Sequence, residues 1–321
     1  MSGPKKWVVI IVCGMALVLS SFSFWPILQL NLLNVAATKA LLANEPITPD
    51  MVRAMVHYTP VSSNRLTTAG LLWVKIFGES GREQAAKTLQ LANSLGSLEE
   101  RATLGVRLER QAEMWAGQGL TIQGKVAFEL ITYLALPFPE PYFRMGEAYY
   151  SRLYDIGIPC RNAYELAIQA PASSPRDNDF KAMAHTRLCE HWLRGSSNYI
   201  LAEYHCRQAI QLGTYRVFSG EYIYLAYILL GQTLAEQERF TEAIDVIQSI
   251  LQQRISDKTY EAMGMYTLAY YVLEAQSSWS EALEIYRQII LLQAAESWTE
   301  AARNRMMVLC VEHPEIGCST P

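Results

Sequence analysis

The sequence has little of the positive charge that a nucleic-acid-binding surface requires. Its 27 lysine and arginine residues are fewer than its 31 acidic residues, and they are scattered along the chain. Proteins that bind a phosphate backbone gather such cations into a stripe or patch. We therefore expect no nucleic-acid partner.

The sequence also lacks the residue patterns that mark a reaction. The segment at 78–83, GESGRE, has no Gly-Lys-Ser/Thr of a phosphate-binding loop, and neither a nucleophile elbow nor a CxxCH haem motif occurs. The adjacent Glu99 and Glu100 are typical of a helix start, where carboxylates favour the positive end of the helix dipole. We expect no catalytic residue, no cofactor and no enzymatic activity. An enzyme acting on envelope polysaccharide is an alternative that no motif supports.

Alternating segments of the kind that form β-strands are scarce, whereas Leu, Ala, Gln and Glu abound. Proline and glycine lie mostly between segments of helical periodicity. Half of the 321 residues are hydrophobic, so the chain can bury a substantial core in one large domain or two ordinary ones. The sequence predicts an all-α protein.

No charged residue occurs from Trp7 to Leu28, and Lys5 and Lys6 stand directly before this run. In a helix rising ~1.5 Å per residue, Trp7 and Trp25 would lie about 27 Å apart, so each indole could rest at one interface of a bilayer. The run predicts a single transmembrane helix. The lysine pair predicts a cytoplasmic amino terminus, with the rest of the chain on the other side of the cell membrane.

A cleaved secretory signal is the competing interpretation of this segment. Small residues near Ser21 and Ser23, or Ala36 and Ala37, could form a cleavage site. The apolar run is longer than the roughly 7 to 15 residues of a usual signal core, which favours an uncleaved anchor.

The sequence beyond this segment predicts pairs of helices. We divide the sequence into a cytoplasmic stub with the anchor (1–38), a neck with a short helix that begins at Thr48-Pro49 (39–63), a helical-repeat domain (64–313) and a tail (314–321). Amphipathic spacing predicts six helical pairs and a last helix that caps them, at 66–93, 98–133, 142–170, 180–212, 224–251, 263–292 and 298–311.

The fifth pair is the most regular. Leu230, Gly231 and Leu234 mark its first helix, and the second helix places Phe240, Ala243, Ile247 and Ile250 on one face. Similar phrases end the second helices of two other pairs, NAYELAIQAP at 162–171 and EYHCRQAIQL at 203–212. This pattern resembles the tetratricopeptide (TPR) repeat, although the recurrence of about 36 to 42 residues exceeds the 34 of a strict repeat.

The resemblance implies a right-handed superhelix of about six TPR-like pairs that holds other proteins in a concave groove lined by the first helix of each pair. It also implies which side chains would face that groove. These candidate partner-binding residues are Arg187, His191, Gln232, Glu236, Tyr271 and Glu274. Plain solvent-facing positions are the alternative interpretation of the same residues.

The fourth pair contains a cluster of cysteine and histidine residues. His185 and Cys189 share a helix face, but no second CxxC-type pair completes four ligands, so we expect no metal. Outside the cytoplasm, a disulfide between Cys189 and Cys206 is more attractive, and Cys310 and Cys318 could staple the tail to the last helix. Cys160 would then remain as a buried thiol.

Together these features predict a non-catalytic, membrane-anchored scaffold that docks onto a membrane or envelope protein complex. The alternative is a structural subunit that assembles with itself, with the apolar amino-terminal helix in the core of an oligomer or filament.

Overall fold

The computed structural model describes residues 48–57, 62–152, 158–213, 220–253 and 257–316, together with positions 32, 35–37 and 39. Within these ranges the protein is all-α: every regular element is an α-helix, a 3₁₀ turn or a π-helix. The chain forms two compact units that divide between Leu136 and Pro137. The predicted anchor residues Lys5, Lys6, Trp7 and Trp25 lie outside the described residues. Among the helices that are described, none combines the length and the apolarity needed to cross a bilayer.

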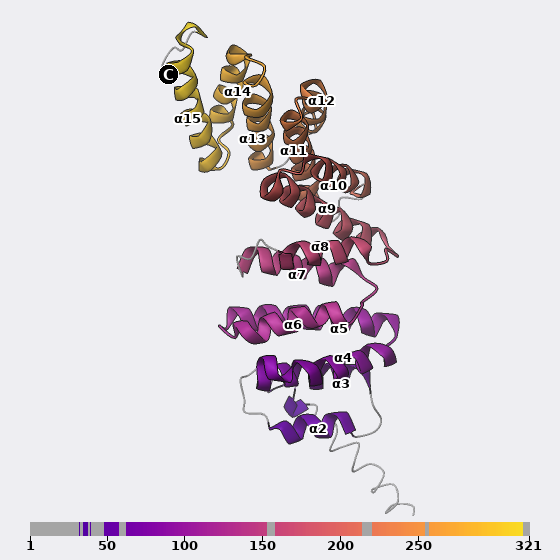
Figure 1. The fold of residues 1–321 in the computed structure, drawn as a ribbon. Helices are drawn as coiled ribbons and strands as arrows, with labels where there is room; N and C mark the ends of the chain where they lie inside the picture. Colours follow the sequence, from indigo (N-terminus) through magenta and orange to yellow (C-terminus); the bar gives the residue numbers. More distant parts are fainter. Residues whose placement is uncertain are drawn as a thin grey trace, which may run out of the picture. The chain divides into compact units, whose positions relative to one another are not determined.

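The first unit contains a short helix and two helical pairs (Figure 1). Its elements are α2 (Pro49–His57), α3 (Ser63–Phe77), the 3₁₀ turn η1 (Gly78–Gly81), α4 (Arg82–Leu95), α5 (Leu98–Gly117) and α6 (Thr121–Tyr133). Helix α3 packs on α4, α5 packs on α6, and α3 and α4 also contact the second pair. The largest fully buried side chain, Trp115, lies on α5 in this unit.

The second unit contains four pairs and a last helix. Its elements are α7 (Pro139–Arg152), α8 (Ile158–Gln169), α9 (Pro175–Ser196), α10 (Tyr199–Leu212), α11 (Gly220–Glu236), α12 (Phe240–Leu251), α13 (Lys258–Thr267), the π-helix η2 (Leu268–Leu273), α14 (Trp279–Leu292), α15 (Glu296–Glu312) and the 3₁₀ turn η3 (Pro314–Ile316). Each helix packs against its neighbour in the sequence, so the expected consecutive pairs are confirmed in the described residues.

Local sequence sets where these helices begin. Ser97 accepts a hydrogen bond from the backbone of Glu100, and the Glu100 side chain accepts one from the backbone of Ser97. Ser174 and Asp177 repeat this reciprocal arrangement before α9, with Pro175 as the first helical residue. Such capping boxes satisfy backbone N–H groups that the first turn of a helix leaves without partners.

Close contact within the pairs depends on glycine. A Cβ atom added to Gly231 of α11 would overlap the side chain of Ile247 on α12, and one added to Gly146 of α7 would overlap the ring of Tyr164 on α8. Ala243, Ile247 and Ile250 are fully buried. The sequence register of the fifth pair is therefore confirmed, because the stripe predicted to face its partner does so.

Helix α15 closes the core of the second unit. Ala302 and Leu309 are fully buried, and Trp298 and Met306 pack at the edge of a core that extends back to α9. The opposite side of α15 exposes Met307, Val308 and Val311, with Val311 at 81%. The last helix, predicted at 298–311 to cap the pairs, is thus in contact with the preceding pair, and a second apolar stripe faces outward.

Candidate functional site

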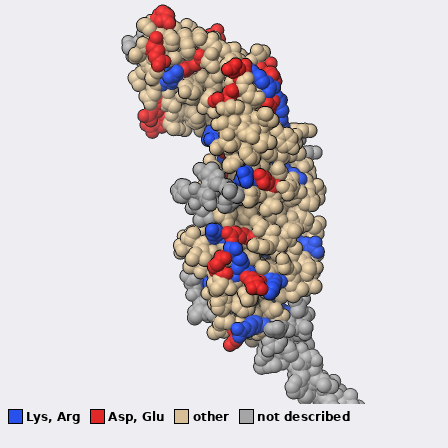
Figure 2. Space-filling model, viewed as in Figure 1, with Lys and Arg blue, Asp and Glu red and all other residues tan. Residues whose placement is uncertain are grey.

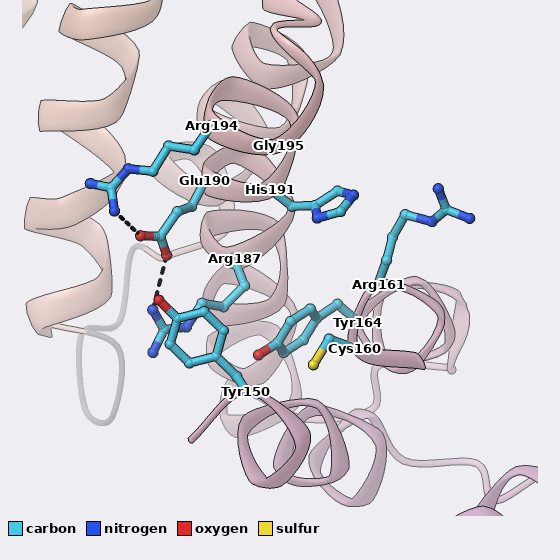
Figure 3. A pocket seen from close by; sticks show the side chains of 9 residues that line it. All are labelled: Tyr150, Cys160, Arg161, Tyr164, Arg187, Glu190, His191, Arg194 and Gly195. Atoms are coloured by element: carbon cyan, nitrogen blue, oxygen red, sulfur yellow. Dashed lines mark hydrogen bonds and ion pairs between the residues drawn. The ribbon is translucent and has the colours of Figure 1, made fainter. Parts of the chain in front are cut away.

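Two cavities in the second unit contain five of the six predicted partner-binding residues. The first, which we call the arginine cavity, lies among α7, α8 and α9 and has a volume of about 290 Å³. Figure 3 shows its nine lining side chains, with Arg187, Glu190 and Arg194 directed to one side and His191 and Arg161 to the other. Tyr150, Cys160, Tyr164 and Gly195 complete the lining.

Arg187 is the centre of a buried polar cluster beside this cavity. Its Nε and Nη2 donate to the two carboxylate oxygens of Glu147, at 2.7 and 2.8 Å, and Nη1 donates to Glu190 at 3.0 Å. The guanidinium also lies 4.6 Å from the ring centre of Tyr150 and 5.2 Å from that of Tyr222. The sequence placed Arg187 in the groove, but its donors are occupied by partners inside the unit.

The carboxylate of Glu147 accepts four hydrogen bonds from side chains on three helices. The Tyr164 hydroxyl donates to Oε1 at 2.8 Å and the Tyr222 hydroxyl donates to Oε2 at 3.0 Å, in addition to the two bonds from Arg187. Burial, and then the charge of Glu147, raises the pKa of both tyrosines. Burial alone would lower the pKa of Arg187, but its hydrogen bonds to Glu147 outweigh that effect and raise it. Arg187 and the two tyrosines therefore keep their protons at neutral pH, which suits a structural role.

The second cavity, which we call the C-terminal groove, is open and has a volume of about 900 Å³. It lies where the end of α11 and the turn to α12 face η2 and the start of α14. Its lining includes Glu236, Glu238, Phe240, Tyr270, Tyr271 and Trp279. Glu274 and Arg305 form one wall. The groove therefore combines aromatic rings with carboxylates.

The π-helix η2 brings two consecutive tyrosines into the groove. The backbone N–H of Glu274 donates to the carbonyl of Ala269 at 3.0 Å, five residues earlier, where an α-helix would use a residue four earlier. Both Tyr270 and Tyr271 line the groove, with ring centres 5.0 Å apart and planes at 86°. Sequence periodicity did not reveal this wide turn, because the spacing of its apolar residues is also compatible with a regular α-helix.

Glu274 is buried rather than open to a partner. It accepts hydrogen bonds from Tyr286 at 2.6 Å and from Nε of Arg305 at 2.9 and 3.0 Å, and Nη2 of Arg305 also donates to it. Arg305 rests 5.3 Å from the ring centre of Tyr270. This pairing fastens α15 to η2 and α14.

The remaining predicted residues have differing environments. His191 lines the arginine cavity, where burial lowers its pKa. Glu236 is exposed in the C-terminal groove, and its carboxylate accepts a hydrogen bond from Tyr199 at 3.4 Å. Gln232 is half-buried on α11 and lines neither cavity. A role in binding a partner stays a prediction for these residues.

The cysteine and histidine cluster forms a disulfide and a histidine pair. Cys189 and Cys206 are joined with their Cα atoms 5.3 Å apart, and both are fully buried. His185 and His205 contact each other through Nδ1 atoms 2.9 Å apart. Within the described ranges no group of three or more histidine, cysteine or acidic residues is placed to hold a metal ion. Cys160 donates to the carbonyl of Gly146 at 3.5 Å, and Cys318 lies outside the described residues, so its pairing with Cys310 stays a prediction.

The histidine pair predicts a loss of stability in acid. Burial is the main cause that lowers the pKa of His185 to about 3 and that of His205 to about 4, from an ordinary value of 6.5. Between pH 6.5 and 4 the unfolded chain therefore binds more protons than the folded one, and the free energy of unfolding should fall as the pH falls, by on the order of 1 kcal/mol per pH unit. Urea unfolding between pH 7 and 4.5 measures this slope.

The variant H185Q/H205Q should flatten that slope. The variant H313Q serves as the control, because His313 stacks on Trp279 in another part of the unit and leaves the pair intact. Equal slopes in the wild type and in the double variant would contradict the assignment.

Basic and acidic side chains are interspersed on the face drawn in Figure 2, and much of that face carries neither. This distribution is in keeping with the scattered charge of the sequence.

The fold defines the class of the protein as an all-α protein of consecutive helical pairs. No protein-family model matches the sequence, and no curated protein matches it. Among solved structures, the TPR domain of P58(IPK) aligns with 88% of this chain and 89% of its own, at 10% identity and a TM-score of 0.30. A likeness this low carries no argument about the arrangement or the function of the present chain.

Proposed function

We propose that this protein is a non-catalytic scaffold that binds other proteins through the helical pairs of its second unit. The observation that carries the proposal is the C-terminal groove, an open cleft of about 900 Å³ lined by tyrosine, phenylalanine and tryptophan side chains of the kind that is enriched at protein interfaces. The consecutive pairs and the TPR-like phrases of the sequence support it, because stacked pairs of this kind present extended binding surfaces.

We further propose that the scaffold is anchored in the cell membrane by residues 7–28, with its helical pairs outside the cytoplasm, where it docks onto a membrane or envelope protein complex. The uncharged run after Lys5 and Lys6 supports the anchor. The disulfide between Cys189 and Cys206 supports the location, because such bonds persist in oxidising compartments.

Affinity purification from detergent-solubilised membranes, with quantitative mass spectrometry, tests the scaffold. We expect one or a few proteins in near-stoichiometric amounts with the tagged full chain, in a particle larger than the chain alone. Recovery of the chain as a monomer without companions would overturn the proposal. Release of the full chain from membranes by alkaline carbonate, which strips docked proteins but not transmembrane ones, would count against the anchor.

Self-assembly is the second candidate, and the outward stripe of α15 favours it. Met307 and Val311 are 58% and 81% exposed at the end of the stack of pairs, where another helix could cover them. A large homopolymer that forms without other proteins in the same purification would support this candidate.

A further inference from the structure

We propose that the C-terminal groove binds an arginine-bearing segment of a partner protein, with the guanidinium held between Tyr271 and the carboxylates of Glu236 and Glu238. The inference rests on the proposed scaffold function and specifies the chemistry of its partner. Three features of the groove carry it: its unbalanced charge, its aromatic wall and the way it already holds one arginine of its own.

The charge of the groove is negative where a partner would enter. Glu274 and Arg305 neutralise each other in the wall. Glu236 and Glu238 are both exposed, and no lysine or arginine of the described chain forms an ion pair with either. Arg194 is near enough to act on Tyr271, but it is paired with Glu190 at 2.7 Å. An acidic peptide or a phosphate would therefore be repelled.

The position of Glu238 adds to this arrangement. It lies in the turn between α11 and α12 with a φ of 59°, in the left-handed region that few residues other than glycine adopt. The turn is held by backbone hydrogen bonds from Glu238 to Ala235 and from Arg239 to Leu234, at 2.8 and 2.9 Å. Its carboxylate is thus carried on an ordered turn, and both Glu238 and Glu236 line the groove.

The aromatic wall suits a cation. Tyr270 is 39% exposed, and Tyr271 is half-buried beside it. The faces of such rings attract a guanidinium or an ammonium group. A purely apolar segment would bury the two carboxylates of the groove without a partner, which is unfavourable.

The groove already holds one guanidinium in the proposed manner. Arg305 lies over the ring of Tyr270 at 5.3 Å while Glu274 accepts its hydrogen bonds. Tyr271, Glu236 and Glu238 also combine a tyrosine ring with carboxylates in the lining of the groove, and the nearby Arg194 is paired with Glu190. Arginine fits this combination better than lysine, because its planar fork both stacks on rings and bonds carboxylates through two donors.

Fluorescence anisotropy with the purified full chain tests the proposal. The probe is a fluorescein-labelled glycine–serine peptide with two arginines, compared with matched peptides that carry lysine, glutamine or glutamate at both positions. We expect the arginine peptide to bind most tightly, the lysine peptide more weakly, and the other two not to bind. The variant E236Q/E238Q should weaken arginine-peptide binding by roughly tenfold.

Further variants distinguish binding of the peptide in the groove from non-specific electrostatic attraction to the protein. Y271A should weaken binding by roughly fivefold, and Y271F should leave it nearly unchanged because the ring remains. The control E300Q/E312Q removes the same net charge from exposed positions of α15 that do not line the groove, and should bind as the wild type does. Urea unfolding of every variant checks that the unit remains folded.

Four outcomes would overturn the proposal. If the peptides bind with no preference for arginine, or if E300Q/E312Q weakens binding as much as E236Q/E238Q, the groove does not recognise arginine. If the arginine peptide fails while partner proteins still copurify with both the wild type and E236Q/E238Q, the scaffold function stands and the inference falls. If neither the peptide nor any protein binds, both fall.

Discussion

Replacing Arg187 with methionine should lower the free energy of unfolding of the second unit by about 3 to 5 kcal/mol. Only 16% of the Arg187 side chain and 25% of the Glu147 side chain are exposed. Methionine keeps much of the volume but leaves the Glu147 carboxylate without its two strongest donors in a buried place. An unpaired buried charge costs far more than the ion pair contributes, because the desolvation of the remaining partner is no longer offset.

Urea unfolding followed by tryptophan fluorescence measures the loss, and hydrogen exchange locates it in α7, α9 and α11. The double variant E147Q/R187M should recover part of the stability, because it removes the stranded charge. The control R287M removes one member of an exposed pair with Glu284, 3.5 Å apart, and should cost less than about 1 kcal/mol. If R187M were as mild as R287M, the cluster would not hold these helices together.

Removing the disulfide should cost about 3 kcal/mol of unfolding free energy. The bond joins residues 17 apart in the sequence, and closing a loop of this length restricts the unfolded chain by an amount of that order. The bond also joins the middle of α9 to the middle of α10, inside one helical pair. The loss should therefore be felt first in this pair and in α11, which packs on both helices.

The variant C189A/C206A and the wild type in dithiothreitol should unfold at similar, lower urea concentrations than the oxidised wild type. C160A serves as the control, because Cys160 has a buried side chain outside the disulfide, so dithiothreitol should lower the unfolding midpoint of C160A as much as it lowers that of the wild type. Thiol counting shows when the wild type is fully reduced. If its unfolding midpoint in urea is then the same as that of the oxidised wild type, the prediction is wrong.

The sequence predicts the helical pairs well because their determinants are local. The spacing of Ala243, Ile247 and Ile250 is visible within one helix, and all three are fully buried. Gly231 signals close contact because no other residue leaves that space. Ala302 and Leu309 of the last helix are likewise seven residues apart, two helical turns, and both are fully buried.

The site could be predicted only in part because its chemistry is set by residues far apart in the sequence. Arg187 was recognised as a first-helix residue, but Glu147, which occupies its guanidinium, is 40 residues away and has no local signature. Glu274 was likewise expected to face the groove, and it lines the groove, but Arg305 and Tyr286 already donate hydrogen bonds to its carboxylate. Neither Glu238 nor Tyr270 was singled out, since the left-handed turn and the π-helix that place them leave no clear trace in hydrophobic spacing.

The π-helix has a mechanical consequence for the end of the molecule. Each residue of an α-helix turns the chain by about 100°, so the additional residue in Leu268–Leu273 sets the rotational phase of everything that follows it. If the same residues wound as a regular α-helix, Glu274 would lie about a quarter-turn away from Arg305 and Tyr286. The same shift would turn Tyr271 out of the groove. The additional residue therefore sets the rotation that aligns the tyrosine wall with the attachment of α15.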